Sequence, residues 1–123
     1  MSLQSINPTT GEVLETFIET SSREIEQILH KAQAAFLGWR TQPLSERAAL
    51  MREAAGSLRG RKEECARMMA LEMGKPIAQG EAEVEKCAWG CDYFAEHAVA
   101  MLAEQARHTD ASRSYVRFDP PPR

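Results

Sequence analysis

Apolar residues repeat at helical spacing over most of the chain and alternate at strand spacing near its two ends. Two short alternating runs, 3–6 and 13–18, predict strands near the start. Between them Pro8 fixes φ and Gly11 permits a positive φ, so residues 7–11 are predicted to turn. The second strand carries apolar residues on both faces. It is therefore expected to be covered on both sides or to lie as an edge against another segment.

The next two periodic runs predict helices with continuous apolar faces. Ser21 and Glu24 form a capping box that opens the first helix, and Gly38 and Pro43 end it. Its predicted apolar stripe is Ile25, Ile28, Leu29, Ala32, Phe36 and Trp39. The second helix begins near residue 44, and its packing seam steps by four and three through Leu44, Ala48, Met51, Ala55 and Leu58.

Two further helices follow a predicted break at Gly60. The third covers residues 62–73, with Gly74 at its C′ position and Pro76 at the N1 position of the next helix. The fourth is the longest, from residue 76 to about residue 105. Its predicted seam is Val84, Cys87, Cys91, Phe94, Ala98 and Met101. So long a seam predicts packing against more protein than this chain supplies; the alternative is that a surface formed by three helices covers much of it.

Glycines interrupt the fourth predicted helix at positions 80 and 90. Each costs a helix about 1 kcal/mol relative to alanine. Two explanations remain open for Gly80 and Gly90: a close helix crossing that needs them, or a helix that is simply weak.

Alternation returns at residues 114–118, which predicts one C-terminal strand before three consecutive prolines. The predicted fold is α+β and mainly helical, with an N-terminal β-hairpin, about four helices of which the last is long, and one C-terminal strand. At 123 residues the chain is at most one domain. Its predicted parts are the hairpin (1–20), the helical region (21–106), a strand segment (107–120) and a tail (121–123).

Charge and composition narrow the possible partners and location. The net charge is -3 with acids and bases interspersed, so neither nucleic acid nor an anionic membrane is an expected partner. No apolar run approaches the roughly 20 residues that span a bilayer. No signal peptide is visible either, so the expected location is cytoplasmic.

Three cysteines are present, Cys65, Cys87 and Cys91. The odd number argues against a disulfide framework. His97 and His108 do not fall at usual ligand spacing, so no metal site is expected. We interpret the cysteines as small buried apolar residues and none of them as a nucleophile.

No motif in the chain builds an active site from its own residues. Gly74-Lys75 is not a phosphate loop, because Met69 and Pro76 stand where Gly and Ser or Thr are needed. The alternating glutamates 81, 83 and 85 read as solvated surface. Trp39 and Trp89 are interpreted as core or interface anchors.

Short motifs in a fixed order nevertheless resemble the N-terminal region of NAD(P)-dependent aldehyde dehydrogenases, and among them the succinate-semialdehyde dehydrogenase branch. The resemblance runs from Ser5 to about Pro120. It is carried by Ile6-Asn7-Pro8, Thr10-Gly11-Glu12, Phe36, Trp39, Pro43, Glu46-Arg47, Leu50, Glu72-Met73-Gly74-Lys75-Pro76, Glu83-Val84, Lys86-Cys87-Ala88-Trp89, Tyr93-Phe94-Ala95 and Tyr115-Val116-Arg117-Phe118-Asp119-Pro120.

The resemblance implies that this chain forms a structural part of the enzyme, next to the part that carries the catalytic residues. In the family these helices lie next to a Rossmann-like cofactor domain, and the last strand enters an oligomerisation sheet. The family oxidises an aldehyde through a cysteine, passes hydride to NAD(P)+ and uses a glutamate base and an asparagine amide. Those three residues would all lie beyond Arg123. We therefore expect no catalytic and no cofactor-binding residue here, and neither NAD nor NADP is expected to bind this chain alone.

One family feature carries over to residues of this chain. Alignment on Lys86-Cys87 implies that Gln79 and Glu83 face the substrate entrance; the alternative is that both are solvated helix-surface residues. After residue 120 the family continues with Leu-Gly and a hydrophobic strand, whereas Pro121-Pro122-Arg123 stands here. That departure suggests a truncated or frame-shifted gene product.

Two functional hypotheses follow. The first is an N-terminal segment of a semialdehyde-oxidising dehydrogenase, inactive alone. The second is a non-catalytic helical interaction or oligomerisation module. The expected partner is the remainder of the dehydrogenase fold or a homo-oligomer partner.

Overall fold

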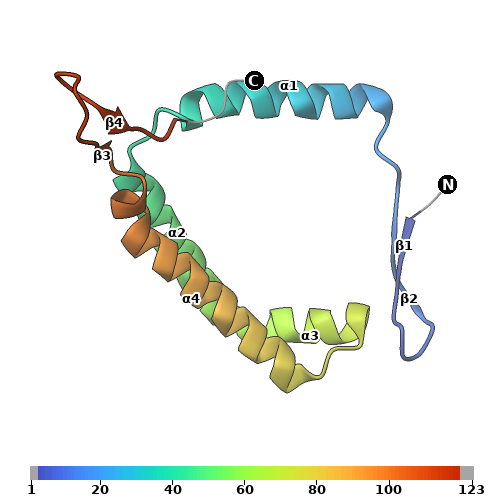
Figure 1. Ribbon diagram of the computed structural model, residues 1–123. Coiled ribbons are helices and arrows are strands. Elements are labelled where there is room, and N and C mark those ends of the chain that lie inside the picture. Colours follow the sequence, from blue (N-terminus) through green and yellow to red (C-terminus); the bar gives the residue numbers. More distant parts are fainter. Residues whose placement is uncertain (1–2, 120–123) are drawn as a thin grey trace.

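The computed structural model describes residues 3–119 and is mainly helical, with two small antiparallel sheets. Figure 1 shows an open arrangement in which α2 and α4 run side by side, while α1 and the N-terminal hairpin lie apart from them. The predicted fold class is confirmed. In chain order the elements are β1 (Leu3–Ile6), β2 (Val13–Phe17), α1 (Ser22–Trp39), α2 (Leu44–Gly60), α3 (Lys62–Met73), α4 (Ile77–Met101), β3 (Gln105–Ala106) and β4 (Tyr115–Val116).

The hairpin turn forms as its composition predicts. The side-chain oxygen of Asn7 accepts the backbone N–H of Thr9 at 2.9 Å and that of Thr10 at 3.4 Å. Gly11 adopts a φ of 75° and donates its N–H to the carbonyl of Asn7 at 2.8 Å. These bonds satisfy the turn backbone locally, and the turn connects β1 and β2, which pair antiparallel.

The hairpin touches the remainder of the structure at the end of α3. The Ser5 hydroxyl donates to a carboxylate oxygen of Glu72 at 3.0 Å. Leu14 lines a shallow hollow together with Met68 and Leu71 of α3. Of the two alternatives for the second strand, an edge against another segment therefore holds, while Phe17 on the strand stays half exposed.

Helix α1 begins at the predicted capping box. The Ser21 hydroxyl accepts the N–H of Glu24, and the Glu24 carboxylate accepts the N–H of Ser21. None of the helix's residues is buried. Ile28 and Leu29, from the predicted apolar stripe, are 57% and 58% exposed. Helix α1 is therefore an amphipathic helix whose apolar face is not covered within residues 3–119.

The packed part of the chain is the antiparallel pair α2 and α4, with α3 against the start of α4. Polar contacts fix the pairing direction: Arg59 near the end of α2 bonds Glu85 and Asp92 at 2.8 Å each, while Arg52 reaches the carbonyl of Ala95 at 3.4 Å. The seam predicted for α2 is confirmed, with two residues buried and three partly buried. The buried apolar residues of the whole described chain are Ala48, Ala55, Ala66, Val84, Ala88 and Ala95.

The seam predicted for α4 is wrong in part. The helix buries Gly80, Val84, Ala88 and Ala95, whereas Phe94 from the predicted seam is half exposed. Small residues let the helix axes approach closely, so the packed face follows alanine and glycine rather than the largest apolar side chains. The large side chains project elsewhere and are uncovered here.

The two glycines of α4 have different explanations. A Cβ on Gly80 would lie 3.0 Å from the Cα of Ala66, so the crossing of α3 and α4 requires glycine there. A Cβ on Gly90 would meet nothing within 4 Å. The close crossing therefore explains Gly80, and within residues 3–119 no contact explains Gly90.

Three boundary predictions need correction. Pro76 is the N-cap of α4 rather than N1, because its ψ of 135° is extended. Helix α4 ends at Met101 instead of near residue 105. Of the residues expected to continue it, 102–104 are neither helix nor strand and Gln105 begins β3, which pairs antiparallel with β4. Gly74, in contrast, takes the predicted left-handed C′ conformation with a φ of 68°.

The exposed surface is large for the mass. The chain exposes 9973 Å², against about 6,600 Å² for a compact monomer of 13.8 kDa. The excess of about 3,300 Å² exceeds the roughly 800 Å² per partner of a standard interface. The surface therefore has the extent expected of a protein that packs against further protein.

No helix within residues 3–119 is both long and apolar enough to cross a membrane.

Candidate functional site

The candidate site is the start of α4, where the resemblance places Gln79 and Glu83. The left-handed Gly74 ends α3 and the extended Pro76 starts α4, so the chain reverses within three residues. The carbonyl of Pro76 accepts the N–H of Gln79 at 2.9 Å and that of Gly80 at 3.0 Å. The turn thus fixes the first turn of α4 and the direction in which its side chains project.

Gln79 and Glu83 are four residues apart, so they share one side of the helix. Both are exposed, whereas the residues that follow them, Gly80 and Val84, are buried. The Glu83 carboxylate pairs with the ammonium group of Lys75, whose side chain is 23% exposed. The structure brings Glu83 and Lys75 together and leaves the Gln79 side chain facing outward.

A shallow hollow runs along the same side of α4. It is lined by Ala82, Glu83, Lys86 and Cys87. The hollow combines one neutralised carboxylate, one ammonium group and one thiol from a single helix. It can contribute charge to a site but does not enclose a substrate.

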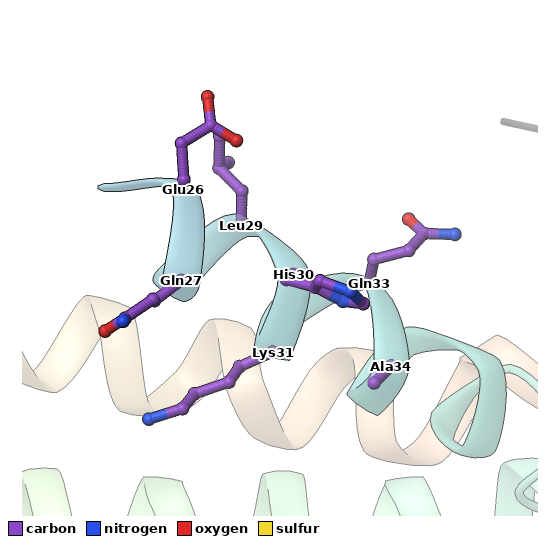
Figure 2. A pocket seen from close by; sticks show the side chains of 7 residues that line it. All are labelled: Glu26, Gln27, Leu29, His30, Lys31, Gln33 and Ala34. Carbon is purple, nitrogen blue, oxygen red and sulfur yellow. The ribbon is translucent and has the colours of Figure 1, made fainter. Parts of the chain in front are cut away.

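A second hollow follows the side of α1 and comes from that helix alone (Figure 2). In Figure 2, Glu26 and Leu29 project from one edge of α1, while Lys31 and Ala34 project from the other. Side chains that diverge from one helix cannot converge on a small ligand, so this hollow is not a candidate site.

The cysteines are not buried, contrary to the prediction. Cys87 is exposed, and Cys65 and Cys91 are partly exposed; all three are free thiols. The sequence pattern was misleading because the apolar face of α4 is broader than its packed face. Within residues 3–119, no three His, Cys, Asp or Glu side chains gather as a metal site requires.

Aromatic side chains gather on an exposed part of α4. The Tyr93 ring lies 5.7 Å from Trp89, 5.5 Å from Phe94 and 4.4 Å from His97, measured between centroids. Trp89 is 61% exposed, so it is not a core residue of this chain. The i, i+4 spacing of Trp89, Tyr93 and His97 is the sequence signal that predicts this cluster.

The shifted pKa values belong to caps and ion pairs. The hydroxyl and backbone N–H of Ser21 lower the pKa of Glu24, and the guanidinium of Arg61 lowers the pKa of Glu64. Hydrogen bonds that the Arg59 guanidinium donates to the carboxylates of Glu85 and Asp92 raise the pKa of Arg59. All of these groups lie away from the start of α4, and their role is to hold helices.

The described residues do not fit a dinucleotide cofactor. Dinucleotides bind at a glycine-rich turn between a parallel strand and a helix. Both sheets here are two-stranded and antiparallel, and the N-caps of α2 and α4 are Pro43 and Pro76. No step of a hydride transfer can therefore be assigned to these residues.

Comparison with known proteins shows which proteins contain this arrangement of helices and strands. The model of the aldehyde dehydrogenase family matches residues 1–121. The chain is 42% identical over 120 residues to a probable succinate-semialdehyde dehydrogenase [NADP(+)] from Synechocystis, covering 98% of this chain and 26% of that protein. It is 40% identical over 116 residues to a succinate semialdehyde dehydrogenase [NAD(P)+] from Escherichia coli, covering 94% of this chain and 25% of that one.

Solved structures agree. The crystal structure of the Streptococcus pyogenes succinic semialdehyde dehydrogenase, in complex with NADP+ as the cofactor, superposes with a TM-score of 0.85 at 33% identity. The match covers 91% of this chain and 25% of that enzyme. The hairpin, four helices and small C-terminal sheet are thus one part of a larger dehydrogenase fold. The chain belongs to the aldehyde dehydrogenase family, and it spans about a quarter of the length of the relatives it matches.

Proposed function

We propose that this chain is the N-terminal segment of an NAD(P)-dependent succinate-semialdehyde dehydrogenase and does not catalyse the oxidation alone. The observation that carries the proposal is the continuous match of nearly the whole chain to the Synechocystis relative. The chemistry supports the same proposal, because the hollow that the Cys87 thiol lines does not enclose a substrate and no described segment fits a dinucleotide. The role of the chain in the reaction is therefore to support other parts of the fold.

A chimera tests this proposal. The chain replaces the matching quarter of the Synechocystis protein, and turnover of succinate semialdehyde with NAD+ or NADP+ is followed at 340 nm. We expect turnover by the chimera and none by the 123-residue chain. Steady turnover by the pure 123-residue chain would contradict the proposal that it is inactive alone. A chimera that folds but oxidises a different aldehyde would contradict the assignment of succinate semialdehyde as the substrate.

Gln79 and Glu83 belong to the proposal as residues that face the substrate entrance. The ion pair with Lys75 supports this role, because it leaves the entrance side without a free negative charge near an anionic semialdehyde. Removing the Glu83 charge would release the Lys75 charge and attract the substrate. In the chimera, Glu83→Gln is expected to lower KM for succinate semialdehyde roughly two- to fivefold at low salt.

A matched control separates this effect from a general change of charge. Glu81→Gln alters the same helix, on the side where Glu81 lines a hollow with α3. We expect its KM to stay unchanged, and Gln79→Ala to change KM without changing kcat. Equal KM shifts for Glu81→Gln and Glu83→Gln would reject the entrance assignment.

The proposed location is the cytoplasm. Three free thiols, one of them exposed, suit a reducing compartment. Fractionation of cells expressing the native gene tests this, and recovery from a secreted or oxidised fraction would contradict it.

A further inference from the structure

Helix α1 has a defined position in the described chain without packing against it. None of its residues is buried, and no other described element packs extensively against it. Figure 1 shows α1 apart from the pair of α2 and α4, and the loop 40–43 links it to α2. In its apolar stripe, Ile28 and Leu29 are 57% and 58% exposed. Contacts within residues 3–119 therefore do not fix where α1 lies.

The same arrangement nevertheless recurs in a larger enzyme. The match to the Streptococcus pyogenes enzyme covers 91% of this chain with a TM-score of 0.85, but 25% of that enzyme. The part of this chain left out of the match is about 11 residues, so it cannot contain all 18 residues of α1. An arrangement that internal contacts do not fix, but that recurs inside a larger protein, is held by the rest of that protein. The expected cover of the α1 stripe is therefore the other three quarters of the dehydrogenase fold.

We propose that the 123-residue chain binds a second polypeptide that carries those three quarters, without a covalent link, and that the α1 stripe is its main docking surface. This inference rests on the proposed function, because it treats the chain as one segment of that fold. The second polypeptide presents an apolar groove, since an amphipathic helix binds by burying its apolar face. The large side chains that the stripe offers at helical spacing are Ile25, Ile28, Leu29, Phe36 and Trp39.

The extent of the exposed surface indicates a permanent complex. The chain as a whole exposes about 3,300 Å² more than a compact monomer of its mass. Permanent complexes bury roughly 2,000–5,000 Å² in total, which is about 1,000–2,500 Å² per partner. The excess is large enough for an interface of that class, so we expect the complex to survive purification.

The main test makes the two polypeptides in the same cells, so that they can fold together. One is this chain, and the other is the part of the Synechocystis protein outside the match, which alone carries an affinity tag. We expect the chain to copurify with the tagged polypeptide in a ratio of one to one. The chimera, in which the same two pieces are covalently joined, shows whether their junction is tolerated.

Two alanines of α1 supply matched variants. Ala32 follows Ile25 by about two turns and lies on the stripe, whereas Ala34 follows it by about two and a half turns and lies on the opposite face. In Figure 2, Ala34 projects from the edge of α1 opposite to Leu29. We expect Ala32→Glu to reduce the copurified chain at least about tenfold and Ala34→Glu to change it by less than about twofold. Far-UV circular dichroism of each free chain checks that helix content is kept.

Hydrogen exchange identifies the element that docks. In the free chain the amides of α1 are expected to exchange fast, because nothing covers the helix, while those near the buried Val84 and Ala88 of α4 exchange slowly. In the complex, exchange along α1 is expected to slow at least about tenfold. A complex in which the α1 amides keep their free-chain rates would show that another face docks, and would overturn the assignment to α1.

Two further outcomes would overturn the inference. One is a soluble, active chimera whose two pieces do not copurify when made separately. The other is an equal loss of copurified chain for Ala32→Glu and Ala34→Glu. The first leaves the proposed function standing. Copurification of the two pieces, with no turnover by either the complex or the chimera, would instead support this inference and contradict the proposed function.

Discussion

Helix α1 and the antiparallel pair of α2 and α4 come from one chain, and both have the periodicity of amphipathic helices. Helix α1 has the stronger start, a complete capping box, and a stripe with large aliphatic and aromatic side chains, yet it buries nothing. The pair of α2 and α4 starts at prolines without a side-chain cap, yet it holds most of the core. An apolar stripe therefore shows that a helix needs a partner, while small residues show where two helices of the same chain meet.

The largest expected effect comes from overpacking the paired helices. Ala88 on α4 is fully buried, so Ala88→Leu is expected to cost about 1–3 kcal/mol of unfolding free energy. The same change at Ala34 on α1 is expected to alter it by no more than about 0.5 kcal/mol. Urea denaturation followed by far-UV circular dichroism measures both. Similar losses at the two sites would erase the distinction between the covered and the uncovered helix.

The two glycines of α4 allow a packed position and an open position to be compared within one helix. Gly80→Ala forces a Cβ to 3.0 Å from the backbone of Ala66, and we expect it to destabilise the protein by about 1–3 kcal/mol. Gly90→Ala meets open space and is expected to stabilise it by up to about 1 kcal/mol through helix propensity. Thermal denaturation gives the signs. Stabilisation by both changes would show that the crossing of α3 and α4 is looser than described.

Removing the link between α2 and α4 should have a smaller effect. Arg59→Ala loses both the Glu85 and the Asp92 contacts, but these side chains are 40–49% exposed and screened by solvent. The expected cost is about 0.5–1 kcal/mol, decreasing in high salt. Arg23→Ala on α1 is the control, and its urea midpoint should not move. A loss for Arg59→Ala that is independent of salt would indicate packing by the arginine stem rather than ion pairing.

Low pH is expected to weaken the N-terminus of α1 slightly. Hydrogen bonds from Ser21 lower the folded-state pKa of Glu24 below its ordinary 4.5, so the carboxylate stabilises the helix above pH 4.5. This contribution is lost as the pH falls through the lowered pKa. Amide chemical shifts of Ser21 and Glu24 followed by NMR should titrate together in this window, and Glu24→Gln should abolish the change. Titration of the two amides at different pH values would separate the cap from the carboxylate.

Local signals predicted most of the elements, because they act within a few residues. Backbone conformation is specified locally by the capping box, by the turn at Gly11 and by the left-handed Gly74. The bounds of α3 follow from Gly60 and Gly74. The end of α4 was overestimated because residues 102–105 include good helix formers. Strand β3 is two residues long and exists by pairing with β4, which no local pattern reveals.

The packed face of α4 was predicted less well for a different reason. Large apolar residues such as Phe94 and Met101 were expected to define the seam, but within this chain the contact is made by Gly80, Ala88 and Ala95. For the candidate site, the sequence indicated Gln79 and Glu83 through resemblance alone. The Lys75 partner of Glu83 lies eight residues earlier, across a turn, so helical spacing gives no indication of it.

The contact between the N-terminal hairpin and the end of α3 has a consequence for synthesis. Ser5 and Glu72 are 67 residues apart, and Pro8 comes within 3.5 Å of the position that a Cβ on Gly74 would occupy. A ribosome adding 5–20 residues per second needs about 3–13 s to extend the chain over that distance. The hairpin can close its own turn at once, but it must wait through that interval before its docking place is made. A slower codon before residue 74 would lengthen the wait without changing the final structure.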